Sequence, residues 1–139
     1  MTRTVLRGAD LTNTYLRGAD LSEADLKGAR LRRAFLKSAK LSDTTLSGAD
    51  FTKADMREAD LRRSDMRDAI LVDTDLTGAD LTSALLDGVQ FSESVRPEGR
   101  NQRTQWPNGI LPKGYQADTL ERHETTVVRV LRIATPQTE

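Results

Sequence analysis

The stretch Leu16-Arg17-Gly18-Ala19-Asp20-Leu21 holds one period of a pattern that runs without interruption from Leu6 to Phe91. Every fifth position of this run is a large apolar residue, and a small residue, most often alanine, stands two positions before it. The large residues are 14 leucines, two phenylalanines and two methionines, one in each of 18 consecutive repeats. A repeat this regular indicates one architecture for the whole run.

A five-residue period fits neither an ordinary helix nor one continuous strand. In an α-helix each residue advances by about 100°, so successive large residues would be spread around the whole circumference. In a strand, side chains alternate between two faces, and because five is odd, consecutive large residues would lie on opposite faces. The pattern therefore predicts a solenoid, in which the chain turns once per repeat and directs each large residue towards a common axis.

Turn-forming residues occupy fixed places in the repeat, with glycine often two positions after the large residue and aspartate often one position before it. Runs such as Leu16–Leu21 and Leu76-Thr77-Gly78-Ala79-Asp80-Leu81 resemble those of pentapeptide repeat proteins, and the resemblance covers residues 4–93. It implies an all-β fold, a right-handed quadrilateral β-helix in which four repeats make one square coil. The 18 repeats would then form about four and a half coils, with residues 20 apart stacked on one another.

The period ends after Phe91, so we divide the chain into a β-helix over residues 1–93 and a cap or tail over residues 94–139. An open β-helix end exposes unpaired backbone and apolar side chains, and we expect the tail to cover it. The segment 106–112, Trp-Pro-Asn-Gly-Ile-Leu-Pro, is similar to one that follows the repeats in many cyanobacterial members of the family. Residues 117–133 fit a strand or a helix equally well. The expected capping residues over the last half coil are Trp106, Ile110, Leu111 and Tyr115.

The composition of the 139 residues argues against most catalytic chemistry. The chain has 21 basic and 21 acidic side chains and no cysteine, which excludes disulfides and thiolate metal sites. The single histidine, His123, lies outside the repeats, and the sequence has neither a glycine-rich phosphate loop nor paired metal-ligand spacing. We therefore predict no enzyme activity, no cofactor and no metal site.

No apolar run approaches the length of about 18 residues that a membrane span requires, and the N-terminal residues enter the repeats with no apolar signal segment. We expect a cytoplasmic protein without membrane contact.

Charge differs along the predicted rod. With the second, third and fourth coils taken as residues 24–43, 44–63 and 64–83, their net charges are +4, 0 and −4. Such a gradient fits solvent-exposed repeat faces whose charge varies from coil to coil without a functional cause. It also fits an oriented electrostatic docking surface or head-to-tail association of copies.

One outward position carries aromatic residues where other repeats carry aspartate. Tyr15 and Phe35 are 20 residues apart, so in the quadrilateral coil they would stack on one face. The ladder Arg17, Lys37 and Arg57 flanks them, and together these five residues form a candidate contact patch for a protein partner. The alternative is a cross-strand aromatic pair that only stabilises the sheet.

These observations favour a non-catalytic protein–protein interaction or scaffold module with an unidentified protein partner, either a monomer or a dimer through an uncapped coil end. The resemblance suggests one alternative, because some members of the family mimic duplex DNA and inhibit or protect type II topoisomerases such as DNA gyrase. Mimicry needs a dense negative surface, whereas residues 1–93 carry 14 basic and 16 acidic side chains. We expect no direct nucleic-acid binding, because no groove of interleaved aromatic and basic residues is predicted.

Overall fold

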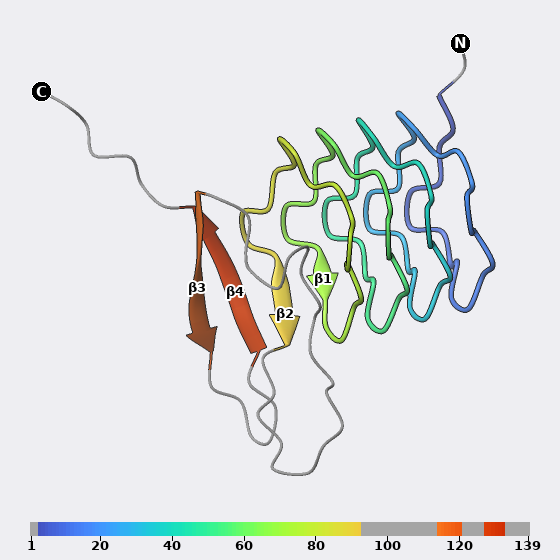
Figure 1. Cartoon of the computed structure of the whole chain (residues 1–139). Helices are drawn as coiled ribbons and strands as arrows, with labels where there is room; N and C mark the ends of the chain where they lie inside the picture. Colours follow the sequence, from blue (N-terminus) through green and yellow to red (C-terminus); the bar gives the residue numbers. More distant parts are fainter. Residues whose placement is uncertain (1–2, 93–113, 121–126, 133–139) are drawn as a thin grey trace, which may run out of the picture.

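The computed structural model describes residues 3–92, 114–120 and 127–132. The repeats wind into a stack of square turns, and a pair of longer strands lies at the end where the repeats finish (Figure 1). Single parallel β-bridges join residues 20 apart along the stack, from Val5 with Asp25 to Asp65 with Leu85. The five-residue period therefore produces a β-helix, with four repeats between one residue and the residue that lies beside it.

Backbone hydrogen bonds connect each turn of the stack to the next in a constant pattern. The N–H of Leu16 donates to the carbonyl of Phe35 at 2.8 Å, and the N–H of Phe35 donates to the carbonyl of Thr14 at 2.9 Å. The residue before each large apolar residue thus directs both its N–H and its C=O towards the preceding coil. This polarity decides which backbone groups are left without a partner at the two ends of the stack.

Each corner of the coil is a tight turn. The amide of Ala19, for example, donates to the carbonyl of Leu16 at 3.0 Å. The second of the two residues between them, Gly18, has a φ of 66°, in the left-handed region that favours glycine. The turn explains why glycine recurs two positions after the large residue.

The large residues and the small residues two positions before them fill the axis of the stack. From the second coil onward the large residues are almost completely buried, for example Leu26, Leu46 and Phe51 at 0% exposure. Where the small residue is polar, its hydroxyl is bonded: Thr74, also fully buried, donates to the carbonyl of Phe51 at 2.8 Å. In the first coil the large residues are only half-buried: Leu6, Leu11, Leu16 and Leu21.

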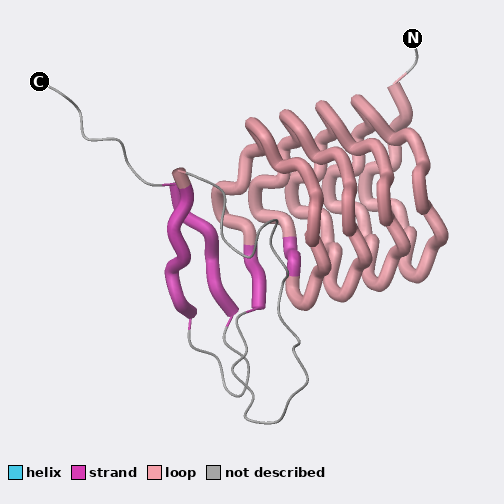
Figure 2. Tube along the Cα trace, in the orientation of Figure 1, coloured by secondary structure: helices cyan, strands magenta, loops and turns pink. Residues whose placement is uncertain are grey.

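Four strands form one sheet along a side of the stack, in the order β1-β2-β4-β3 (Figure 2). The repeats supply β1 (Ile70–Leu71) and β2 (Gln90–Ser92), which pair in parallel. The C-terminal segment supplies β3 (Tyr115–Leu120) and β4 (Val127–Arg132), which pair antiparallel with each other. β4 also pairs antiparallel with β2, so the C-terminal strands continue the sheet beyond the last repeat.

The strands answer the question that the sequence left open, because the described parts of 117–133 are strand. Of the four expected capping residues, Trp106, Ile110 and Leu111 lie outside the described residues, and Tyr115 lies within them.

Among the described residues, no helix is long and apolar enough to cross a membrane.

Candidate functional site

Tyr15 and Phe35 form a stacked pair on the outer surface of the first two coils. They are bridge partners, and their rings are parallel within 5° with centroids 4.7 Å apart. The position before a large apolar residue faces outward, so the pair lies in solvent: Tyr15 is 83% exposed and Phe35 41%. The stacking expected from the 20-residue spacing is confirmed, and it leaves one broad ring face available for contact.

The cationic ladder beside this pair is only partly available. Lys37 places its Nζ 3.2 Å from Oε1 of Glu58, and the Arg57 guanidinium binds both carboxylate oxygens of Asp55, at 2.7 and 2.8 Å. These bonds lower the pKa of the Asp55 carboxyl group and raise the pKa of Arg57. Arg17 alone among the three cations has no ion pair with another described residue, so it is the cation best placed to meet a partner.

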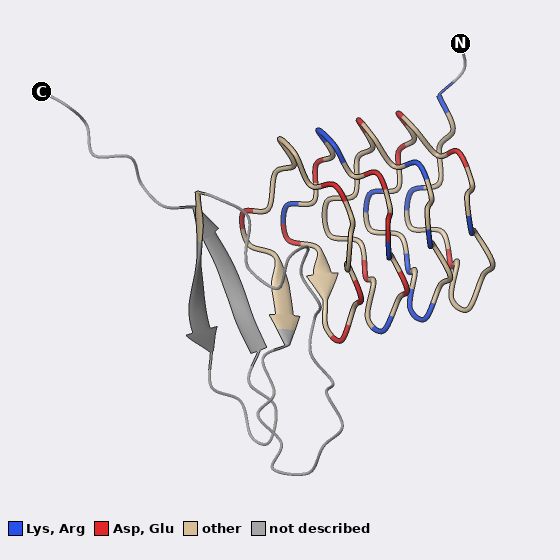
Figure 3. Cartoon of the chain, viewed as in Figure 1, with Lys and Arg blue, Asp and Glu red and all other residues tan. Residues whose placement is uncertain are grey.

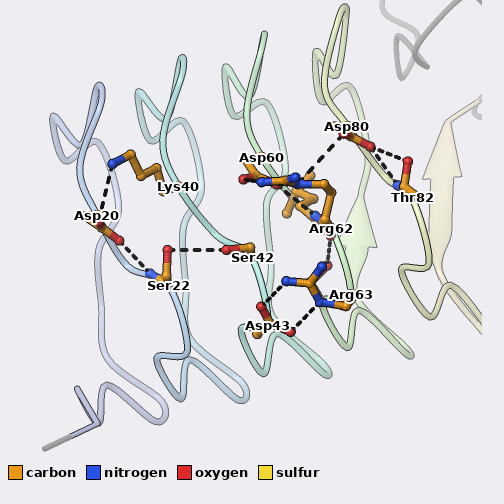
Figure 4. Close-up of polar contacts among 12 residues, drawn as sticks. Asp20, Ser22, Lys40, Ser42, Asp43, Asp60, Arg62, Arg63, Asp80 and Thr82 are labelled. Carbon is orange, nitrogen blue, oxygen red and sulfur yellow. Dashed lines mark hydrogen bonds and ion pairs between the residues drawn. The ribbon is translucent and has the colours of Figure 1, made fainter. Parts of the chain in front are cut away.

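The same pairing of an aspartate with an arginine two positions later recurs on other sides of the stack. An aspartate before the large residue accepts a hydrogen bond from the amide two positions later, and where that later residue is arginine, its guanidinium closes on the carboxylate. Arg62 binds Asp60 in this way, with Nη2 2.7 Å from Oδ2, and reaches Asp80 of the next coil at 3.9 Å (Figure 4). The hydrogen bond lowers the pKa of the Asp60 carboxyl group.

Sequence reasoning missed these pairs, although the spacing Asp-x-Arg signals them at 55–57, 60–62 and 65–67.

Ion pairs between coils also offset the charge gradient. Cations of the basic second coil pair with acids of both neighbours: Arg30 with Asp10 of the first coil at 3.3 Å, and Lys37 with Glu58 of the third at 3.2 Å. Basic and acidic residues are interleaved along most of the stack (Figure 3). This mixed surface offers no support for the DNA-mimic alternative, which stays a prediction.

Groups that could hold a metal ion do not gather in the part of the chain that the structure describes: no three His, Asp or Glu side chains cluster there. His123 falls outside that part. The described outer surface is therefore characterised by one stacked aromatic pair and by carboxylates that already bind arginine, threonine, serine or lysine.

Tyr115 is the one expected capping residue whose contacts are described. Its ring packs against the core, and its hydroxyl accepts a hydrogen bond from the N–H of Leu86 at 3.1 Å and lies 3.4 Å from the carbonyl of Ala84. One coil earlier, the equivalent two groups are the N–H of Met66 and the carbonyl of Ser64. Both are bonded by the backbone of Leu85 in the following coil: its carbonyl accepts from Met66 and its N–H donates to Ser64. The Tyr115 hydroxyl thus takes the place of the backbone that a further coil would supply.

The model of the pentapeptide repeats family matches residues 1–37, 29–68 and 65–95, with eight copies. Among solved structures, the pentapeptide repeat protein Rfr23 from the cyanobacterium Cyanothece 51142 is 31% identical, with a TM-score of 0.62 over 63% of this chain and 59% of that one. A second such protein, alr5209 from Nostoc PCC 7120, is 36% identical, with a TM-score of 0.57 over 58% of this chain and 66% of that one. HetL, a pentapeptide repeat protein from Nostoc sp. PCC 7120 involved in the regulation of heterocyst differentiation, is 30% identical, with a TM-score of 0.56 over 81% of this chain and 51% of that one.

Comparison with curated protein sequences finds no match. The chain spans between about half and two thirds of the length of the three similar structures. Those structures imply a right-handed β-helix, in agreement with the bridges between residues 20 apart. On the match of the family model to the whole repeat region, the chain belongs to the pentapeptide repeat family.

Proposed function

We propose that this protein is a non-catalytic interaction or scaffold module that binds a protein partner through the surface around Tyr15 and Phe35. The rod that presents this surface comprises about four and a half coils, and residues 94–139 act as its C-terminal cap. The observation that carries the proposal is the exposure of the stacked pair, since Tyr15 keeps 83% of its surface in solvent. A pair that served only the sheet would gain from burial.

Aromatic side chains and arginine are the residue types that most often dominate the binding energy of protein interfaces. Two rings already stacked lose little conformational freedom on binding, because their side chains are held before the partner arrives. Arg17 adds a cation without an ion pair on the same side of the rod, so the partner should present an apolar side chain next to a carboxylate. The similar protein HetL is involved in regulation, which is in keeping with a role through binding.

The test is affinity capture from the native organism followed by titration of the purified partner against the full-length chain. The double substitution Tyr15→Ala and Phe35→Ala should weaken binding at least about tenfold, because truncating a hot-spot aromatic costs about 2 kcal/mol or more. Circular dichroism should stay unchanged, because both side chains lie outside the core.

The matched control is Val5→Ala, which shortens another exposed apolar side chain, 65% exposed, on the opposite side of the stack. This control should bind the partner as tightly as the parent protein does. A partner that the double variant binds with unaltered affinity would show that the aromatic pair is not the contact surface.

A further inference from the structure

The first coil ends the stack with a complete set of backbone groups that no other described residue bonds. In the coils that follow, the residue before each large residue bonds to the preceding coil through both its N–H and its carbonyl, and the residue after it bonds through its carbonyl. The same groups of the first coil point away from the stack. They are the N–H and the carbonyl of Val5, Asp10, Tyr15 and Asp20, and the carbonyls of Arg7, Thr12, Arg17 and Ser22.

These groups are spaced for antiparallel pairing with an identical end. In an antiparallel ladder, two hydrogen bonds flank each pair of opposed residues that do not bond to each other. If Leu16 faces the partner's Leu21, the N–H of Tyr15 meets the carbonyl of the partner's Ser22. The N–H of the partner's Asp20 then meets the carbonyl of Arg17. A second copy turned end over end presents its strands antiparallel on all four sides at once, whereas a straight peptide could follow only one side.

Charge selects how the two square ends superpose. Successive sides of the first coil carry Arg7, Asp10, Arg17 and Asp20. The two square ends can be superposed side on side in four ways. Two of these place each arginine directly opposite an aspartate of the other copy. In one, Arg17 lies opposite the partner's Asp20, and in the other it lies opposite the partner's Asp10. The other two superpositions form no such pair, so electrostatic complementarity favours the first two.

The interior of the shaft supplies apolar area to the same contact. Leu6, Leu11, Leu16 and Leu21 are only half-buried, whereas Leu26 and Leu31 of the next coil are 0 and 1% exposed. A second copy would cover these leucines with its own and so extend one core through the junction. At the opposite end of the stack, β4 already pairs with β2, so head-to-tail growth is blocked on that side and a closed pair is favoured over a filament.

From these observations we infer that two copies of the chain associate end to end through their first coils, forming a continuous antiparallel junction around one apolar shaft. This contact shares Arg17 with the proposed partner surface, but the test of that surface rests on Tyr15 and Phe35. The variants below leave both aromatic residues in place.

The experiment is sedimentation velocity on the full chain over a range of concentrations up to about 100 µM, which detects dissociation constants in the micromolar range. The parent protein should form a dimer reversibly. The substitution Arg17→Glu should raise the dissociation constant at least about tenfold, because the two-fold axis places the repulsive pair at two points of the junction. The control Lys53→Glu makes the same change of charge in the third coil, at a side chain without an ion pair in the described structure, and should leave the dimer intact.

Charge-swap variants identify the superposition. Arg17→Glu combined with Asp20→Arg should restore the dimer if Arg17 faces the partner's Asp20, and Arg17→Glu combined with Asp10→Arg should restore it if Arg17 faces the partner's Asp10. Thermal unfolding of each variant confirms that the coil is intact. A chain that stays monomeric at every concentration, a dimer that Arg17→Glu leaves unchanged, or a failure of both swaps to restore association would each overturn the inference.

Discussion

One residue in every repeat, two positions after the large apolar residue, adopts a left-handed backbone conformation. This is true of every such position from Gly8 to Gly88, although only six of these residues are glycine. The others include Lys53, with a φ of 61°, and Arg33, with a φ of 55°. For a residue with a side chain this conformation costs roughly 1–2 kcal/mol, so the corners of the coil are strained wherever glycine is replaced.

Gly28 tests this strain without a steric complication. Its φ is 66°, and an added Cβ would meet nothing within 4 Å. The substitution Gly28→Ala should therefore lower the free energy of unfolding by about 1 kcal/mol, through backbone strain alone. Chemical denaturation measures the change, with Ser47→Ala, a partly exposed position outside the left-handed region, as the control. A Gly28→Ala variant as stable as the parent would mean that the corner accepts a side chain freely.

Sequence reasoning identified the buried residues correctly because the interior tolerates only one register. Phe51 and Met56 occupy their places as reliably as the leucines do, and both are fully buried. The surface was harder to predict. Lys37 and Arg57 were expected to flank the aromatic pair, but which carboxylates they bind was not predicted, because this depends on side-chain directions across coils, as with Lys37 and Glu58.

At the level of strands, the repeats form single bridges and very short strands, whereas the C-terminal segment forms two strands of six residues. Sequence reasoning predicted that something should cover the last coil but could not assign 117–133. A β-branched stretch such as 125–133 carries no period that separates strand from helix. The strand within it, β4, pairs with β2, which lies far away in the sequence.

The Tyr115 hydroxyl offers a test of how the last coil is satisfied. The substitution Tyr115→Phe keeps the ring against the core but leaves the N–H of Leu86 without its 3.1 Å acceptor. Removing this partner from a part-buried amide should lower the free energy of unfolding by about 1–2 kcal/mol. Thermal unfolding measures the loss.

Tyr15→Phe is the control, because the Tyr15 hydroxyl is exposed and has no hydrogen-bond partner in the described structure. It should change stability by less than about 0.5 kcal/mol. Equal effects of the two substitutions would contradict the role assigned to Tyr115.

At the scale of the whole molecule, nine carboxyl groups of the described residues share one electrostatic property. Side-chain hydrogen bonds lower the pKa of each of these nine groups below its ordinary value in the folded state. The groups are Asp10, Asp20, Asp25, Asp43, Asp55, Glu58, Asp60, Asp65 and Asp80. The unfolded chain therefore binds more protons than the folded one in acid, and stability must rise with pH across this range.

The melting temperature should be constant near neutral pH and fall as the pH drops below about 4, where the unfolded carboxylates take up protons first. Differential scanning calorimetry from neutral to acidic pH measures this dependence. In Asp60→Asn, which removes one of these carboxyl groups, the melting temperature should fall less steeply. A melting temperature that stays level or rises in acid would contradict the assigned pKa shifts.

Because partners along the stack are always 20 residues apart, the coil is the natural unit of insertion and deletion. Excising one full coil, such as residues 44–63, would return each later side chain to the side of the rod that it occupies now. Excising a single repeat would instead rotate everything downstream by a quarter turn and carry the C-terminal strands to an adjacent side. Length changes in multiples of a coil would therefore alter only the height of the rod, whereas shorter ones would redirect whatever its surfaces recognise.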